Sequence, residues 1–186
     1  RWLSAAQLQS GQAEAALASI DRAIALAPED AELHLARAGV LVGSRKPDEA
    51  RAALDQATGL DPNQFGAYLS QAQLALARGD LEEAERVNRL AERVSPNHPQ
   101  LAVVEGMVAL QRGETDTALK RVSQAIEAAP DDAQLRYVLG FIYMAKGHLA
   151  FAEQAFRRVL ELNPAITSLH GLVVQLALRQ QLRQPL

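Results

Sequence analysis

Five prolines on a fixed period constrain the fold more than any other feature of this sequence. They lie 34 residues apart, at Pro28, Pro62, Pro96, Pro130 and Pro164. Proline has no backbone N–H and cannot continue a helix, so it is common just after a helix ends. A 34-residue period is typical of tandem helix-turn-helix units. The sequence therefore predicts an all-α chain built from repeats.

Other residue types follow the same period. Alanine stands twelve residues before each proline, where a small side chain lets two helices approach. Glycine stands seventeen residues before most of them, and it predicts a turn with positive φ between the two helices of a unit. The alanine positions are Ala16, Ala50, Ala84, Ala118 and Ala152. The turn positions are Gly11, Gly79, Gly113 and Gly147, with Arg45 in place of glycine in one unit.

This pattern resembles the tetratricopeptide repeat (TPR) family, whose signature is W-x2-L-G-x2-Y, then A-x3-F, then P. The most complete copy consists of Leu139, Gly140, Tyr143, Ala152, Phe156 and Pro164. Elsewhere the copies are degenerate: the tryptophan position holds His34, Tyr68, Ala102, Arg136 and His170. The resemblance covers almost the whole chain and implies a right-handed α-solenoid of tandem TPR repeats.

We expect one superhelical domain over residues 1–186. Its repeats span about 1–30, 31–64, 65–98, 99–132 and 133–166, and an extra or capping helix spans 167–184. The chain starts at Arg1 rather than at methionine, which favours a fragment or a processed product. We also favour an array that continues beyond Leu186.

Composition argues against several classes of function. The net charge is only −3 and the basic residues are scattered, so no footprint for nucleic acid is present. The chain has no cysteine, and its apolar runs are far shorter than the ~20 residues that span a bilayer. We expect a soluble chain with no direct membrane insertion and an undecided compartment. No motif predicts a catalytic, cofactor-binding or metal-binding residue, so we predict that the chain is not an enzyme and needs no cofactor.

An acidic cluster at Glu82, Glu83 and Glu85 has two interpretations. It has the residue types of a metal site. However, Arg86 follows Glu82 by four residues and Arg89 follows Glu85 by four, which is the favourable order for ion pairs on a helix surface. The sequence favours a solvated charged face.

The resemblance also implies a concave surface lined by the first helix of each unit, at positions i, i+4 and i+7. These positions hold no charged residue in the four complete units. The mapped partner-binding residues are Leu69, Gln73, Leu76, Val103, Met107, Leu110, Tyr137, Phe141 and Met144, preceded by Leu35, Gly39 and Val42. One interpretation is that part of this apolar stripe is buried between neighbouring helices. The other is a hydrophobic groove, deepest around Met107, Tyr137, Phe141 and Met144.

We expect a non-enzymatic scaffold that binds a partner peptide or helix in this apolar groove. The groove lacks the lysine, arginine and asparagine that clamp a C-terminal carboxylate in chaperone-binding members of the family, so that subtype is rejected. An alternative is a regulatory or assembly segment of a larger enzyme, or of a bacterial envelope-assembly protein, with catalysis outside this chain. Self-association through uncapped ends is a third hypothesis.

Overall fold

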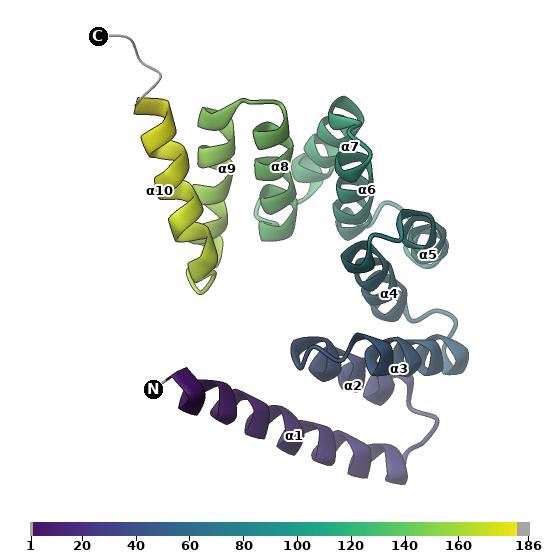
Figure 1. Ribbon diagram of the computed structural model, residues 1–186. Helices are drawn as coiled ribbons and strands as arrows, with labels where there is room; N and C mark the ends of the chain where they lie inside the picture. Colours follow the sequence, from purple (N-terminus) through teal and green to yellow (C-terminus); the bar gives the residue numbers. More distant parts are fainter. Residues whose placement is uncertain (1, 182–186) are drawn as a thin grey trace. The chain divides into compact units, whose positions relative to one another are not determined.

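The computed structural model describes the backbone of residues 2–181 and the side chains of residues 12–166 and 169–177. The described residues form helices joined by short turns, with no strand among them (Figure 1). The helices are α1 (Trp2–Leu26), α2 (Ala31–Gly43), α3 (Pro47–Leu60), α4 (Phe65–Arg78), α5 (Leu81–Val94), α6 (Pro99–Gln111), α7 (Thr115–Ala128), α8 (Ala133–Ala145), α9 (Leu149–Leu162) and α10 (Thr167–Gln181). The all-α prediction is confirmed.

Consecutive helices pack as hairpins. The closest pairs are α2 with α3, α4 with α5, α6 with α7, and α8 with α9. We call the earlier helix of each pair the first helix and the later one the second helix. By its place in the period, α1 is a second helix and packs on α2, while α10 is a first helix and packs on α9.

The periodic prolines lie in the turns between hairpins. Each second helix ends two residues before its proline, as α3 does at Leu60 before Pro62 and α9 does at Leu162 before Pro164. Proline also starts helices here: α3 begins at Pro47, where the missing N–H costs nothing. The predicted role of the prolines as helix terminators is confirmed.

The turn inside each hairpin requires a left-handed backbone at one position. Gly79, Gly113 and Gly147 adopt φ of 75°, 78° and 75° there. Arg45 takes the same place in the repeat formed by α2 and α3, with φ of 58°, although it carries a side chain. The turn prediction is therefore confirmed in four repeats.

Gly11 does not form the turn that its position predicts. The helix α1 runs without a break from Trp2 to Leu26 and passes through Gly11. Gly11 is followed by Gln12, a good helix former. Glycine permits a left-handed turn but does not enforce one.

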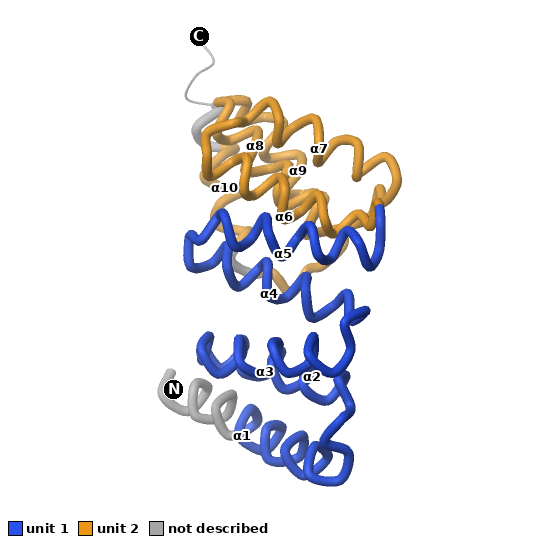
Figure 2. The backbone as a smooth tube through the Cα atoms, turned by 90° about the vertical axis from the view of Figure 1, so that its right-hand side faces the viewer, with its two compact units in different colours: residues 1–96 blue, residues 97–186 orange. Residues whose placement is uncertain are grey.

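The chain divides into two compact units, unit 1 (Arg1–Pro96) and unit 2 (Asn97–Leu186) (Figure 2). In unit 1 one buried cluster lies between α2 and α3, where Leu41 and Leu54 are fully buried. In unit 2 one buried cluster joins α6, α7 and α8, and a second joins α9 to α10.

A small residue on a first helix faces a larger one on its second helix. A Cβ added to Gly140 would lie 2.4 Å from Cε1 of Phe156, and one added to Gly106 would lie 2.5 Å from Cγ2 of Val122. Both helices therefore approach closely only because these glycines lack a side chain. This packing fixes how α8 presents its remaining faces.

Candidate functional site

The predicted aromatic residues of α8 form one cluster. The rings of Tyr137 and Phe141 meet edge to face with centroids 4.9 Å apart, and Phe141 meets Phe156 in the same way at 5.2 Å. Phe156 is fully buried on α9, Phe141 is half-buried, and Tyr137 is 37% exposed. The cluster thus runs from the core to the surface, and its buried ring holds the two outer rings in place.

Neighbouring predicted residues lie on α6, which packs against α8 within unit 2. Met107 and Leu110 are half-buried and contact the cluster that joins α6, α7 and α8, while Met144 contacts the α9–α10 cluster. Val103 is only 8% exposed and belongs to the core itself. The structure therefore brings four of the six predicted residues of unit 2 to half-buried positions, leaves Tyr137 exposed, and buries Val103.

In unit 1 the predicted residues lie along α4. Leu69, Gln73 and Leu76 are all half-buried and follow one another at helical spacing. This stripe belongs to unit 1, whereas the α6 and α8 residues belong to unit 2.

The sequence did not single out a second aromatic group in unit 2. Tyr143 at the end of α8 stacks against exposed His148 with centroids 6.3 Å apart, and its ring lies 5.3 Å from that of Phe151 at the start of α9. Phe151 is 55% exposed. The sequence holds one signal for this group, which is Phe151. It is an aromatic residue on a second helix, at a position outside the repeat pattern, and second helices carry most of their charged residues at such positions.

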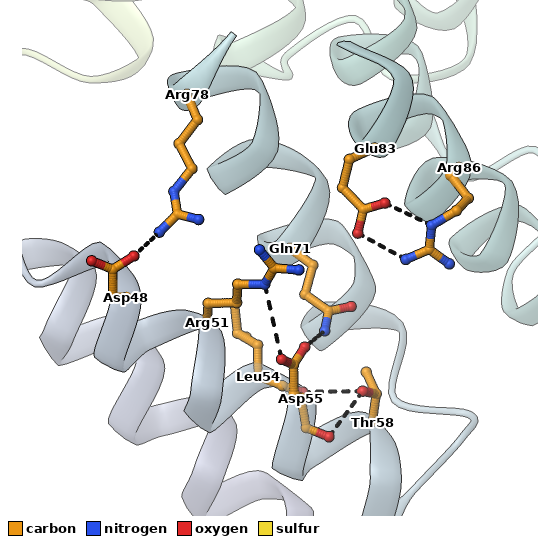
Figure 3. A network of polar contacts seen from close by, with 9 residues as sticks. All are labelled: Asp48, Arg51, Leu54, Asp55, Thr58, Gln71, Arg78, Glu83 and Arg86. Carbon is orange, nitrogen blue, oxygen red and sulfur yellow. Dashed lines mark hydrogen bonds and ion pairs between the residues drawn. The ribbon is translucent and has the colours of Figure 1, made fainter. Parts of the chain in front are cut away.

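A small polar pocket of about 100 Å³ lies between α3, α4 and α5 in unit 1. Figure 3 shows most of its charged and polar side chains, which pair within α3, within α5, and between α3 and α4. Gln71 Nε2 donates to Asp55 Oδ1 at 2.7 Å, and Arg78 pairs with Asp48. Since its cations and carboxylates compensate each other, the pocket offers no net charge for an anion or a metal ion.

The acidic cluster of α5 is paired differently from the prediction. Arg86 binds Glu83, with Nε donating at 2.6 Å and Nη2 at 2.8 Å, rather than Glu82 (Figure 3). The bidentate hydrogen bond from Arg86 lowers the pKa of Glu83, and the same bond raises the pKa of Arg86. Spacing alone favoured the i,i+4 pair, but Glu83 lies one turn before Arg86 with its backbone N–H bound to the cap residue Asp80.

No group of three or more histidine or acidic side chains suited to a metal ion occurs among the described residues. In the same part of the chain, no helix is both long and apolar enough to cross a membrane.

Comparison with known proteins gives a consistent result. The family model described as tetratricopeptide repeat matches residues 7–70, 41–103 and 109–176. A TPR protein of Thermus thermophilus is 26% identical, with a TM-score of 0.77 over 95% of this chain and 96% of its own. YrrB, described as a TPR protein with an unusual peptide-binding site, is 22% identical, with a TM-score of 0.57 over 89% of this chain and 85% of its own. PilW, a type IV pilus biogenesis factor, is 18% identical, with a TM-score of 0.72 over 92% of this chain and 80% of its own. No curated protein matches the chain significantly.

Proposed function

Because this chain belongs to the tetratricopeptide repeat family, we propose that it binds an apolar peptide or helix of a partner protein on the first helices of unit 2. The fold is an all-α TPR solenoid, and proteins with this fold generally serve as scaffolds for protein–protein interaction. YrrB, which has the same fold, is described as having a peptide-binding site. The proposed surface is named the α6/α8 face and consists of Met107, Leu110, Tyr137, Phe141 and Met144.

The observation that carries the proposal is the anchored aromatic pair on α8. Tyr137 reaches the surface, and the centroid of its ring lies 4.9 Å from that of Phe141 and 6.1 Å from that of Phe156. A ring that is already held in place loses little conformational freedom when a partner binds, and tyrosine adds a hydroxyl that can donate a hydrogen bond. Aromatic anchors of this kind dominate the energy of many protein interfaces.

The rest of the α6/α8 face suits an apolar partner. Its five members include no charged side chain, so a partner need not desolvate an unpaired charge. Both methionines of the chain belong to it, and methionine adapts its shape to different partners. Val103 contributes to the support beneath the face, because it is buried in the core.

The partner segment is proposed to be extended or helical, with apolar side chains on one side. Leu69, Gln73 and Leu76 on α4, in unit 1, are proposed to bind a partner segment by the same chemistry. No observation on the described residues favours the alternative role as a regulatory or assembly segment of a larger enzyme.

The test is selection of binding peptides from a displayed library of random sequences. The wild-type chain should select peptides with spaced apolar residues. The double variant Tyr137→Ser, Phe141→Ser should bind them at least about tenfold more weakly, because loss of an interface anchor costs ~2 kcal/mol or more. Circular dichroism should show the same helix content for both proteins.

The matched control is Phe151→Ser. It removes an aromatic side chain from the same unit but outside the α6/α8 face, and it should leave peptide affinity unchanged. If the double variant retains full affinity while staying folded, the α6/α8 face does not bind the peptide. If Phe151→Ser abolishes binding instead, the site lies in the Tyr143, His148 and Phe151 group.

A further inference from the structure

We propose that Gln100 and Asp132 are positioning residues of the α6/α8 face, because their hydrogen bond holds the N-terminal ends of α6 and α8 together. The bond thereby sets the spacing between the two helices that a partner segment contacts. Neither residue belongs to the α6/α8 face itself. This inference rests on the proposed function, which it extends from the residues that contact a partner to the residues that hold them in place.

The bond joins the starts of the two helices. Gln100 is the second residue of α6, and Asp132 is the N-cap residue of α8. The Nε2 atom of Gln100 donates to Oδ2 of Asp132 at 2.7 Å, and both residues are half-buried. A hydrogen bond to a carboxylate is roughly twice as strong as one between neutral groups. The partial burial of this pair also limits competition from water.

Each end of the bond is fixed by its own helix. The Oδ1 atom of Asp132 accepts from the backbone N–H groups of Gln134 at 2.8 Å and Leu135 at 3.0 Å. One carboxylate therefore caps α8 and holds α6. On the other side, the backbone N–H of Gln100 donates to Nδ1 of His98, the N-cap residue of α6, at 3.2 Å. A movement of either helix start is thus transmitted to the other.

The bond lies on the same side of α6 as the predicted binding residues. Gln100 precedes Val103 by three residues and Met107 by seven, which is the spacing of one helix face. On α8, Asp132 precedes Tyr137 by five residues. The bond is therefore at the N-terminal edge of the α6/α8 face. A change in helix spacing at this edge changes the distance between Met107 and Tyr137.

Unit 1 carries the same bond with donor and acceptor exchanged. Gln64, the N-cap residue of α4, donates through Nε2 to Oε1 of Glu32, the second residue of α2, at 2.8 Å. The two pairs occupy equivalent positions of the repeat, so the arrangement depends on one donor facing one acceptor rather than on particular residues. Unit 1 therefore supplies both a control and a design for restoring the bond.

The test measures the affinity of a peptide selected by the wild-type chain, together with the carbon-13 methyl signals of Met107 and Met144. Gln100→Leu removes the donor and should weaken peptide binding about threefold to tenfold, because helices that are held less well must be ordered when the peptide binds. The matched control Gln64→Leu removes the donor of unit 1 and should leave the affinity unchanged. In the free proteins, only Gln100→Leu should shift the two methyl signals.

Rebuilding the bond in the reverse order should restore binding. Gln100→Glu alone sets two carboxylates against each other and should weaken peptide binding at least as much as Gln100→Leu does. Adding Asp132→Asn supplies a donor of the same length, and asparagine also caps a helix. The affinity of this double variant should return to within about twofold of the wild-type value.

The outcomes separate this inference from the proposed function. If the peptide shifts the Met107 and Met144 signals while Gln100→Leu keeps wild-type affinity, or Gln64→Leu weakens binding equally, the inference is overturned and the proposed function stands. If the wild-type chain binds no peptide on this face, the proposed function fails and the methyl signals of the free proteins decide. A bond that positions the helices shifts them in Gln100→Leu and restores them in the double variant. Unchanged signals overturn the inference.

Discussion

Gly140 determines how closely α8 and α9 approach. Its missing side chain leaves room for the ring of Phe156, with three ring atoms within 2.8 Å of where a Cβ would lie. Phe156 in turn supports Phe141 and Tyr137 at the surface. A single glycine thus links the packing of a hairpin to the geometry of the α6/α8 face.

We predict opposite effects for the same substitution at two helical glycines. Gly140→Ala should destabilise the chain by about 1–2 kcal/mol, because a fully buried ring must move to admit the methyl group. Gly39→Ala should stabilise it by up to about 1 kcal/mol, since no atom lies within 4 Å of the added Cβ and alanine favours helix. Urea unfolding measures both. Equal effects at the two sites would show that the close approach of α8 and α9 is not constrained by Gly140.

Arg45 is strained in a turn where the other units use glycine. Arg45→Gly should stabilise unit 1 by about 0.5–1 kcal/mol. The substitution removes the cost of a side chain at positive φ, which is about 1–2 kcal/mol. Part of this gain is lost because glycine has more conformational freedom in the unfolded chain. Thermal unfolding should report a higher Tm. The matched control is Gly79→Ala, which places a side chain at φ of 75° and should lower the Tm. A lower Tm for Arg45→Gly would contradict the assigned strain.

At the residue scale, the sequence predicted positions better than contacts. The position of Arg45 in the turn followed from the period, because the turn needs one left-handed residue whatever its type. The burial of Val103 did not follow, since residues at i, i+4 and i+7 share a helix face but differ in how much a neighbouring helix covers them. That difference depends on the helices that pack against α6.

Within α5, the ion pair between Glu83 and Arg86 makes stability depend on pH. The folded pKa of Glu83 is lowered, so the pair stabilises the chain above the unfolded pKa of about 4.3. This contribution is lost as the pH falls through the lowered folded pKa. Glu83→Gln should therefore cost about 0.3–0.5 kcal/mol at neutral pH, as expected for an exposed helix pair. The difference from wild type should vanish in acid.

The control for this prediction is Glu82→Gln. Glu82 is exposed on the same helix, one residue away, and Arg86 binds Glu83 instead. The control should show a smaller pH-dependent difference in urea unfolding, because Glu82 shares the first turn of α5 but not the ion pair. A larger effect at Glu82 than at Glu83 would restore the i,i+4 pairing that the sequence favoured.

At the element scale, the end of a helix was predictable wherever the sequence prevents the helix from continuing. Proline cannot continue a helix, and all second helices from α1 to α9 end two residues before one. The break expected at Gly11 was not predictable in the same way, because glycine only permits a turn. The helix α1 therefore continues through Gly11.

For the whole chain, the repeat period also governs contacts between hairpins. In unit 1, Arg78 at the end of α4 pairs with Asp48 at the start of α3. In unit 2, Lys146 after α8 pairs with Asp116 at the start of α7, and both residues lie two periods further along the chain. Successive hairpins are thus joined by an equivalent ion pair in each unit. In unit 2, the hydrogen bond from Lys146 lowers the pKa of Asp116.

The 34-residue period therefore made the fold predictable from the sequence. The positions that recur with this period indicated which residues share a helix face. The aromatic anchoring of Tyr137 and the exposed group around Phe151 were not predictable, because they depend on how side chains from two helices meet.

The most direct test of the α6/α8 face uses the only two methionines of the chain, Met107 and Met144. Labelling their methyl groups with carbon-13 gives a spectrum with two signals, and both report on this face. Titration with a peptide selected by the wild-type chain should shift both methyl signals to saturation at the same dissociation constant. The proposed function is contradicted if the peptide binds and both methyl signals remain unchanged.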